Sequence, residues 1–237
     1  MKCAIMQPTY LPWSGYFNLI ASVDHFVFLD NVQYERRSWQ ARNRILVNGA
    51  EHLLAVPVER CPQDTPLDQV RISEVEDWRR RHWLTLKAAY EKAATGRELL
   101  AQLEPHLTQL GEPLLARFTE AIIRDLVASL GITTRLWRAS ELPAQGVRSE
   151  RFASLCKALD CTTYLSPRGS MQYLEEDDFS ARFGIALEFQ SFEPQLYSQW
   201  RAAQFVSHLS IIDVIANLGL AGARSYLENQ LDEKTDD

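Results

Sequence analysis

Cysteine is scarce in this sequence of 237 residues, and its spacing matches no cysteine motif. No two of the four cysteines have the C-x-x-C spacing of zinc or redox sites. A disulfide scaffold is therefore excluded, and the scatter is typical of reduced, mostly buried thiols in a cytoplasmic protein. The cysteines are Cys3, Cys61, Cys156 and Cys161.

Long apolar runs are also lacking. Gln7 and Pro8 interrupt the apolar start of the chain, and Asp213 and Asn217 interrupt its most apolar late stretch, residues 209–220. The early interruption argues against a signal peptide, and the late stretch is too short to cross a bilayer. We therefore expect a soluble, cytoplasmic protein without membrane insertion.

An excess of basic residues is missing too. The 25 Lys and Arg against 31 Asp and Glu give a net charge of −6. Because sequence-independent nucleic-acid binding depends on phosphate neutralisation, this balance argues against a nucleic-acid partner. The five histidines have no metal-ligand spacing, and no Walker loop, G-x-G-x-x-G or G-x-S-x-G motif occurs. We expect no metal site, and no motif names a nucleophile.

The composition that remains, 46% apolar and 24% charged, is that of a folded globular domain. Short apolar runs alternate with helical patterns, and this alternation predicts an α/β fold with a parallel sheet. Asn48-Gly49 between two apolar runs predicts a β-hairpin. Strands of the sheet are expected near residues 3–6, 25–30, 134–139, 162–165 and 186–189.

Apolar residues at helical spacing predict a helical insertion in this α/β core. Its first helix would begin near Val75, its second would include Leu110, and its third would end at Gly131. A later helix would start at Ser210 and end near Gly219. We expect an N-terminal part of the core with the hairpin (1–72), the insertion (73–131), a C-terminal part of the core (132–230) and a disordered tail (231–237).

The loop after the first strand is the most informative segment. It lies where a strand leads into a helix, and parallel α/β sheets place ligands at such crossings. Its site candidates combine aromatic faces, suited to a base or sugar, with a glycine that lets backbone approach a ligand. An alternative is a proline-braced loop whose aromatics fill the core. The candidates are Gln7, Tyr10, Trp13, Gly15 and Tyr16.

A basic segment follows the second strand. Four arginines and a tryptophan lie within residues 36–44 of an otherwise acidic protein, and guanidinium groups suit carboxylate or phosphate. The binding candidates here are Arg37, Trp39 and Asn43, and the catalytic candidates are Asp30, Gln33 and Arg42. A solvated basic loop is the alternative.

A third segment follows the strand near residues 162–165. Ser166, Arg168 and Gly169 offer a hydroxyl, a guanidinium and flexible backbone, a set that can bind phosphate. A plain turn is the alternative interpretation. The three segments together predict one ligand crevice at the ends of the strands.

These segments resemble the WbqC-like protein family. The matching motifs are Met6-Gln-Pro-Thr-Tyr-Leu-Pro-Trp-Ser-Gly-Tyr-Phe-Asn-Leu-Ile20, Phe26-Val-Phe-Leu-Asp30, Arg42-Asn-Arg-Ile45, Thr163-Tyr-Leu-Ser166, Tyr197-Ser-Gln199 and Leu209-Ser-Ile-Ile-Asp213. The resemblance implies a place in O-antigen or other surface-polysaccharide biosynthesis. It also implies transfer of a glycyl or other aminoacyl group to a sugar.

Residues 8–20, 26–34 and 165–174 are also distantly similar to pantothenate synthetase and other enzymes with a nucleotidyltransferase-like fold. This similarity implies a Rossmann-like core that binds ATP. Trp13 and Tyr16 stand where those enzymes have two phosphate-contacting histidines, so the use of ATP or of a nucleotide-activated substrate stays open.

The leading hypothesis is an acyl or aminoacyl transferase, or amide-forming enzyme, acting on an amino group of a nucleotide-linked sugar or similar small molecule. Arg37, Arg42 and Arg168 would then neutralise the anionic ligand, and Asp30 and Gln33 would orient the acceptor. Two alternatives are a nucleotidyltransferase and a non-catalytic nucleotide-sugar binding protein. The sequence does not indicate the oligomeric state.

Overall fold

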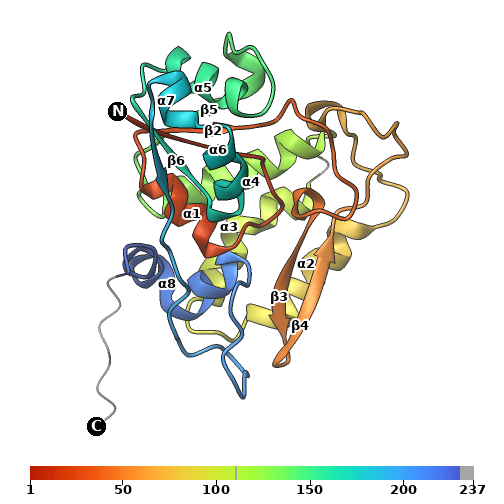
Figure 1. Cartoon of the computed structure of the whole chain (residues 1–237). Coiled ribbons are helices and arrows are strands. Elements are labelled where there is room, and N and C mark those ends of the chain that lie inside the picture. Colours follow the sequence, from red (N-terminus) through yellow and green to blue (C-terminus); the bar gives the residue numbers. More distant parts are fainter. Residues whose placement is uncertain (110, 230–237) are drawn as a thin grey trace.

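Five parallel strands form the main sheet of the computed structural model, which describes residues 1–109 and 111–229 (Figure 1). The order across the sheet is β5-β2-β1-β6-β7, and each neighbouring pair is parallel. The α/β class and the Rossmann-like parallel core expected from the sequence are confirmed. The strands are β1 (Lys2–Met6), β2 (His25–Phe28), β5 (Arg135–Arg138), β6 (Thr163–Ser166) and β7 (Ala186–Phe189).

Both faces of this sheet are buried, which explains the continuous apolar character of its central strands. Successive residues of a strand point to opposite faces. Ala4 and Phe26 belong to the hydrophobic cluster on one face, and Cys3 and Val27 belong to the cluster on the other. The sheet is therefore the middle layer of a three-layer arrangement.

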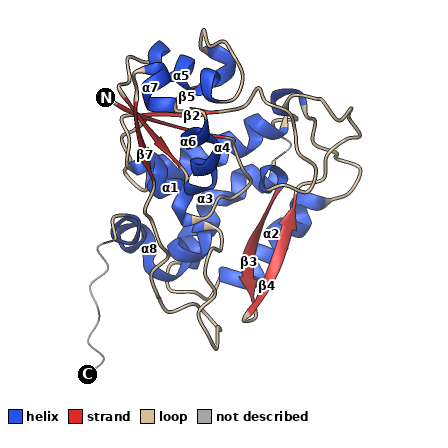
Figure 2. Ribbon diagram, in the orientation of Figure 1, coloured by secondary structure: helices blue, strands red, loops and turns tan. Residues whose placement is uncertain are grey.

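Helices from different parts of the chain form the two outer layers (Figure 2). The cluster that contains Ala4 includes residues of α1 (Ser14–Ala21), α4 (Leu115–Ser129) and α8 (Ile211–Leu227). The cluster that contains Cys3 includes residues of α5 (Ser149–Ala158), α6 (Met171–Glu176) and α7 (Phe179–Phe183).

The predicted hairpin is confirmed. β3 (Arg42–Val47) pairs antiparallel with β4 (Ala50–Ala55) as a separate two-stranded sheet. Asn48 and Gly49 have φ of 51° and 79°, as the tight hairpin turn requires at both positions. A Cβ on Gly49 would also lie 2.6 Å from the Arg201 carbonyl oxygen, so no other residue fits there without a shift.

The expected insertion forms α2 (Trp78–Tyr90), α3 (Gly96–Thr108) and α4. Buried residues of all three helices belong to the same hydrophobic cluster as Ala4 and Phe26 of the main sheet. The four-part division of the chain stays a prediction, and its expected tail, residues 231–237, lies outside the described residues.

Some helix boundaries differ from expectation. The first helix of the insertion, α2, begins at Trp78 and not near Val75. Val75 is 93% exposed, so its side chain faces solvent and does not pack on the core as a residue of the helix would. α8 does not end at Gly219; it kinks there (φ 72°) and continues to Leu227, because the buried Tyr226 and Leu227 anchor its last turns in the core. Leu110 lies outside the described residues.

The strand order locates the place where a ligand is expected. From β1 the chain proceeds to β2 and β5 on one side, whereas β6 and β7 lie on the other side of β1. The topology therefore switches between β1 and β6. Open parallel sheets bind ligands beyond the carboxyl ends of their strands at such a switch point.

Candidate functional site

The loop that follows β1 is fixed by two buried tyrosines. The Tyr10 hydroxyl shares a 2.9 Å hydrogen bond with Nδ1 of His82 in α2, and the Tyr16 hydroxyl donates to the Gln7 carbonyl oxygen at 3.1 Å. Both rings are at most 1% exposed, and burial raises the pKa of both hydroxyls. Tyr10 therefore acts as a core residue, as the alternative interpretation of this loop anticipates.

Trp13 and Gly15 form a close pair at the start of α1. A Cβ on Gly15 would lie 2.1 Å from Cζ2 of the Trp13 ring, so glycine is needed to admit that ring. The indole also stacks on the His208 ring, with centroids 5.0 Å apart and planes at 28°. The Trp13 ring therefore occupies the space beside the Gly15 backbone in which the sequence analysis places a ligand.

A cavity of about 230 Å³ opens beside this pair. Met6 at the end of β1 contributes to its wall, so the cavity lies at the carboxyl edge of the sheet. Aromatic rings form much of the lining, and Arg44 supplies a positive charge. Such a site suits a flat or ring-shaped ligand that carries negative charge. The lining residues are Met6, Thr9, Trp13, Tyr16, Trp39, Asn43, Arg44 and His208.

Trp39 and Arg44 line this cavity, and Arg42 of the same strand lies beside Trp39. The Trp39 ring is 49% exposed, and the guanidinium carbons of Arg42 and Arg44 lie 5.8 and 5.7 Å from its centroid. The Nε atoms of both arginines are buried without a hydrogen-bond partner in the described residues. A buried donor without an acceptor is costly, and an anionic ligand at this face of β3 would supply acceptors.

Amide side chains join β3 to the first loop. Asn43 Nδ2 donates to the Leu11 carbonyl oxygen at 2.8 Å, and its Oδ1 accepts from the Arg44 N–H at 2.8 Å. Gln40 Nε2 donates to Gln7 Oε1 at 2.7 Å. Gln7 and Asn43 therefore hold two walls of the cavity together, and both of these predicted site residues already have protein partners.

The other candidates after β2 lie apart from the cavity lining. Asp30 is 1% exposed, and its carboxylate accepts from the Ser140 N–H and hydroxyl at 2.9 and 2.6 Å. Gln33 lines a different cavity, shared with Arg36 and Pro62. Arg37 is exposed. Their roles in binding or orienting a substrate stay predictions.

The segment after β6 is tied to the chain that follows β7. Arg168 donates to the Gln190 carbonyl oxygen at 3.0 Å and pairs with Glu193 at 2.8 Å. Ser166 is fully buried, whereas a Cβ on Gly169 would meet nothing within 4 Å. Glu193 thus balances the charge of Arg168, and phosphate binding by this segment stays a prediction.

Four lining residues are not among the sequence candidates, and three of them, Met6, Thr9 and Arg44, lie in or beside the segments that the sequence analysis names. His208 lies outside all of those segments. It contributes to the cavity wall and stacks on Trp13, although 195 positions separate the two residues in the chain. The segment is held in place because Ser210 N–H donates to the Arg44 carbonyl oxygen at 2.9 Å and Ile211 N–H to that of Pro12 at 2.8 Å. The pair Ser207-His208 before α8 matches no sequence motif that would identify it as part of a binding site.

Asp213 forms a second, buried polar cluster next to the site. Its carboxylate accepts from the hydroxyls of Tyr90 and Tyr197 at 3.0 and 2.7 Å and from Gln199 Nε2 at 3.1 Å. Burial raises the pKa of the carboxyl. The cluster links α2, α8 and the segment that carries His208, so Asp213 does more than begin a helix.

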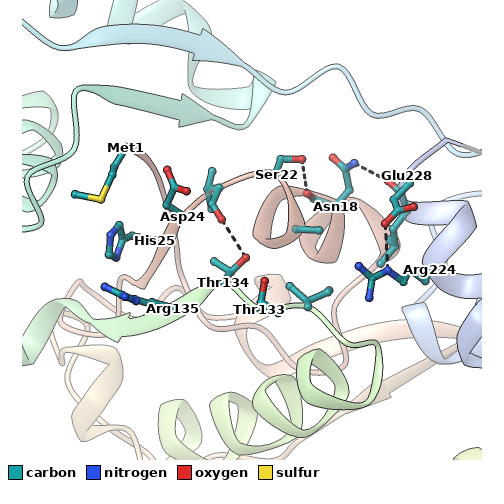
Figure 3. A pocket seen from close by; sticks show the side chains of 14 residues that line it. Met1, Asn18, Ser22, Asp24, His25, Thr133, Thr134, Arg135, Arg224 and Glu228 are labelled. Atoms are coloured by element: carbon teal, nitrogen blue, oxygen red, sulfur yellow. Dashed lines mark hydrogen bonds and ion pairs between the residues drawn. The ribbon is translucent and has the colours of Figure 1, made fainter.

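A larger cavity, of about 600 Å³, lies at the opposite edge of the sheet (Figure 3). Figure 3 shows Asp24, His25 and Arg135 at one end and Arg224 and Glu228 at the other. The Arg224 and Glu228 side chains bond to each other at 3.1 Å. Because it lies at the amino ends of β1, β2 and β5, it is not where parallel sheets bind ligands.

The described part of the chain contains neither a metal-binding cluster nor a membrane-spanning helix. Across residues 1–109 and 111–229, no three His, Cys, Asp or Glu side chains are grouped so that they could hold a metal ion. Within the same residues, no helix has the length and apolar character needed to cross a membrane.

Comparison with known proteins agrees with the motifs described above. The model of the WbqC-like protein family matches residues 7–225. An uncharacterized protein of Mycobacterium tuberculosis (strain ATCC 25618 / H37Rv), Rv1507c, is 30% identical over 228 residues, which cover 95% of this chain and 97% of the relative. No solved structure matches the chain. The chain belongs to the WbqC-like protein family.

Proposed function

We propose that this protein is a cytoplasmic enzyme that transfers an acyl or aminoacyl group, a glycyl group among them, to an amino group of a nucleotide-linked sugar or similar small molecule. The product would serve surface-polysaccharide biosynthesis. The observation that carries the proposal is the cavity at the carboxyl edge, which is lined by aromatic rings and by Arg44, with Arg42 beside Trp39. Within the described residues, the Nε atoms of both arginines are buried without an acceptor.

The parts of the cavity suit different parts of such a substrate. Trp13 and Trp39 offer faces on which a base or sugar ring can stack. Arg42 and Arg44 project from one face of β3 and can neutralise phosphate or carboxylate groups. Catalysis would then depend on proximity and on stabilisation of negative charge, and it needs no covalent intermediate with the protein.

The direct test supplies donor and acceptor together. The protein is incubated with ATP, glycine or another amino acid, and UDP-glucosamine as an amino-sugar nucleotide with a free amine. Mass spectrometry then looks for the amide, and pyrophosphate exchange reports activation of the amino acid by ATP. A preformed acyl adenylate covers the case in which another enzyme activates the donor. If neither amide nor exchange is found across a broad panel of amino acids and amino sugars, the proposal fails.

One observation favours a second candidate, a nucleotide-sugar binding protein without catalysis. The similar nucleotidyltransferases have histidines at two positions where this chain has Trp13 and Tyr16. The Trp13 ring packs on Gly15, and the buried Tyr16 hydroxyl donates to the Gln7 carbonyl oxygen. Calorimetry distinguishes the candidates, since tight binding of UDP-glucosamine without turnover supports the binding protein. Incorporation of a nucleotide in place of amide formation would instead indicate a nucleotidyltransferase.

A further inference from the structure

The 21 residues from Gln190 to Ser210 connect β7 to α8 without forming a helix or a strand. A connection of this length without secondary structure usually has a functional role. Its last part brings His208 to the cavity, where the ring is exposed and stacks on Trp13. The segment therefore contributes an imidazole to a site built otherwise from the first loop and β3.

The backbone at His208 is unusual. Its φ is 58°, in the left-handed region that is strained for a residue with a Cβ. Arg44 Nη2 donates to the His208 carbonyl oxygen at 3.5 Å, and the neighbouring Ser210 N–H bonds to Arg44 as described above. Contacts with β3 thus hold a strained residue in place beside the cavity.

The other polar groups of the cavity wall are unsuited to accept a proton near neutral pH. Burial raises the pKa of Tyr16, whose hydroxyl donates to Gln7. The Asn43 side chain is bonded at both its oxygen and its nitrogen. Arg44 is a permanent cation that pairs with Glu51 of β4. Imidazole, in contrast, has a ring nitrogen whose lone pair can accept a proton.

A serine hydroxyl lies beside one nitrogen of the His208 ring. His208 Nδ1 shares a 2.9 Å hydrogen bond with the Ser207 hydroxyl. When Nδ1 carries the hydrogen and donates it to Ser207 Oγ, Nε2 has a free lone pair, and a hydroxyl can accept as readily as it donates. Ser207 can therefore keep the ring in the tautomer that takes up a proton at Nε2.

We propose that His208 Nε2 is the general base that removes the proton from the acceptor amine, a role that rests on the proposed amide-forming function. The amine nitrogen attacks the carbonyl carbon of an acyl adenylate, and the new C–N bond forms. The proton of the attacking nitrogen passes to Nε2 while the bond from the acyl carbon to the phosphate oxygen breaks. Adenylate leaves with that electron pair, and the imidazolium returns its proton to water.

The test compares His208→Asn with His52→Asn in the full chain. Asn tolerates the left-handed backbone but cannot act as the base, and His52 is an exposed histidine of β4 outside the cavity lining. With glycyl adenylate and UDP-glucosamine, we expect H208N to lower kcat about 100-fold or more. H52N should retain wild-type kcat, and added imidazole should partly restore H208N.

Two further readouts separate this role from a structural one. Calorimetry should show that H208N binds UDP-glucosamine within about threefold of wild type, a difference below 1 kcal/mol. The kcat/KM of wild type should fall at acidic pH, as general-base catalysis requires, and this limb should be lost in H208N. The charged and titratable groups that share the site with the ring are Arg44 and Tyr16, together with Glu51 through its pair with Arg44.

The outcomes distinguish the two proposals. If wild type forms the amide and H208N retains its kcat, His208 is not the base, although the proposed function stands. The same conclusion follows if H208N loses binding and catalysis to the same extent. If wild type forms no amide with any donor of the panel, the proposed function fails and the role of His208 fails with it.

Discussion

Arg42 and Arg44 alternate along β3 and therefore project from the same face of that strand. Arg44 and Arg168 each pair with a glutamate, Glu51 and Glu193 respectively, but the Nε of Arg168 also donates to the Gln190 carbonyl oxygen. The basic residues noticed in the sequence thus fall into two groups. Within the described residues, the Nε donors of the pair beside Trp39 are buried without an acceptor, whereas the Nε of Arg168 has the Gln190 carbonyl oxygen as its acceptor.

We expect Arg42→Ala and Arg44→Ala each to weaken binding of UDP-glucosamine by roughly 10- to 100-fold, because each removes a charged hydrogen bond worth about 1.5–3 kcal/mol. Arg168→Ala is the matched control and should change the Kd less than about threefold. Calorimetry measures the three Kd values, and thermal melts check that each variant is folded. An equal loss of affinity in R168A would instead support the sequence-based assignment of Arg168 to phosphate.

His82 is a buried histidine whose titration affects stability. Burial lowers its pKa to about 4, below the ordinary value near 6.5, so the unfolded chain binds more protons between these two values. The free energy of unfolding should therefore fall as the pH falls from about 6.5 to about 4, by about 3 kcal/mol. Above pH 6.5 the titration of His82 no longer lowers the free energy of unfolding.

Urea unfolding at several pH values tests this expectation. His82→Gln should be less stable than wild type at pH 7, because Tyr10 loses the hydrogen bond to the imidazole. It should, however, lose less stability on acidification. His52→Gln, at an exposed position, should follow the wild-type curve. Parallel curves for wild type and H82Q would show that His82 does not titrate in this range.

Among the elements, α1 depends on one close approach. Its first turn contains Gly15, whose missing side chain leaves room for the Trp13 ring. The first loop, α1 and the His208 segment meet at that ring. A change that moves Trp13 should therefore alter both the stability of α1 and the shape of the cavity.

Gly15→Ala should destabilise the protein by about 1–3 kcal/mol, because the new methyl group overlaps the indole. Trp13→Ala removes the obstacle, so Gly15→Ala should cost much less in that background. A double-mutant cycle measured by urea unfolding gives the coupling between the two positions. Gly169→Ala, which has open space around its Cβ position, is the control. Additive effects of G15A and W13A would contradict the overlap.

Over the whole molecule, the helices of the expected insertion and the main sheet share one hydrophobic cluster. We therefore expect residues 1–229 to unfold in one step, although the sequence suggests separate parts. Tryptophan fluorescence and far-UV circular dichroism should give coincident urea transitions. Trp78→Phe removes the buried indole of α2, and its transition should also be single. Separated transitions would instead establish the insertion as an independent unit.

The sequence predicted local structure well because short apolar runs and the Asn-Gly turn act over few residues. The strand order was less accessible, since β1 pairs with β6 across about 160 positions. Tyr10 and Tyr16 have polar tips that suit a ligand, and only packing reveals that both are buried. His208 could not be assigned either, because its nearness to Trp13 depends on how the segment after β7 returns to the first loop.

The place of β1 at the centre of the sheet also has a consequence for synthesis on the ribosome. β2 is translated soon after β1, whereas β6 is translated only after most of the chain. At synthesis speeds of 5–20 residues per second, the second edge of β1 has no partner for roughly 7 to 30 s. A nascent chain therefore carries an open strand edge during that interval, and a chaperone that covers it would favour correct folding.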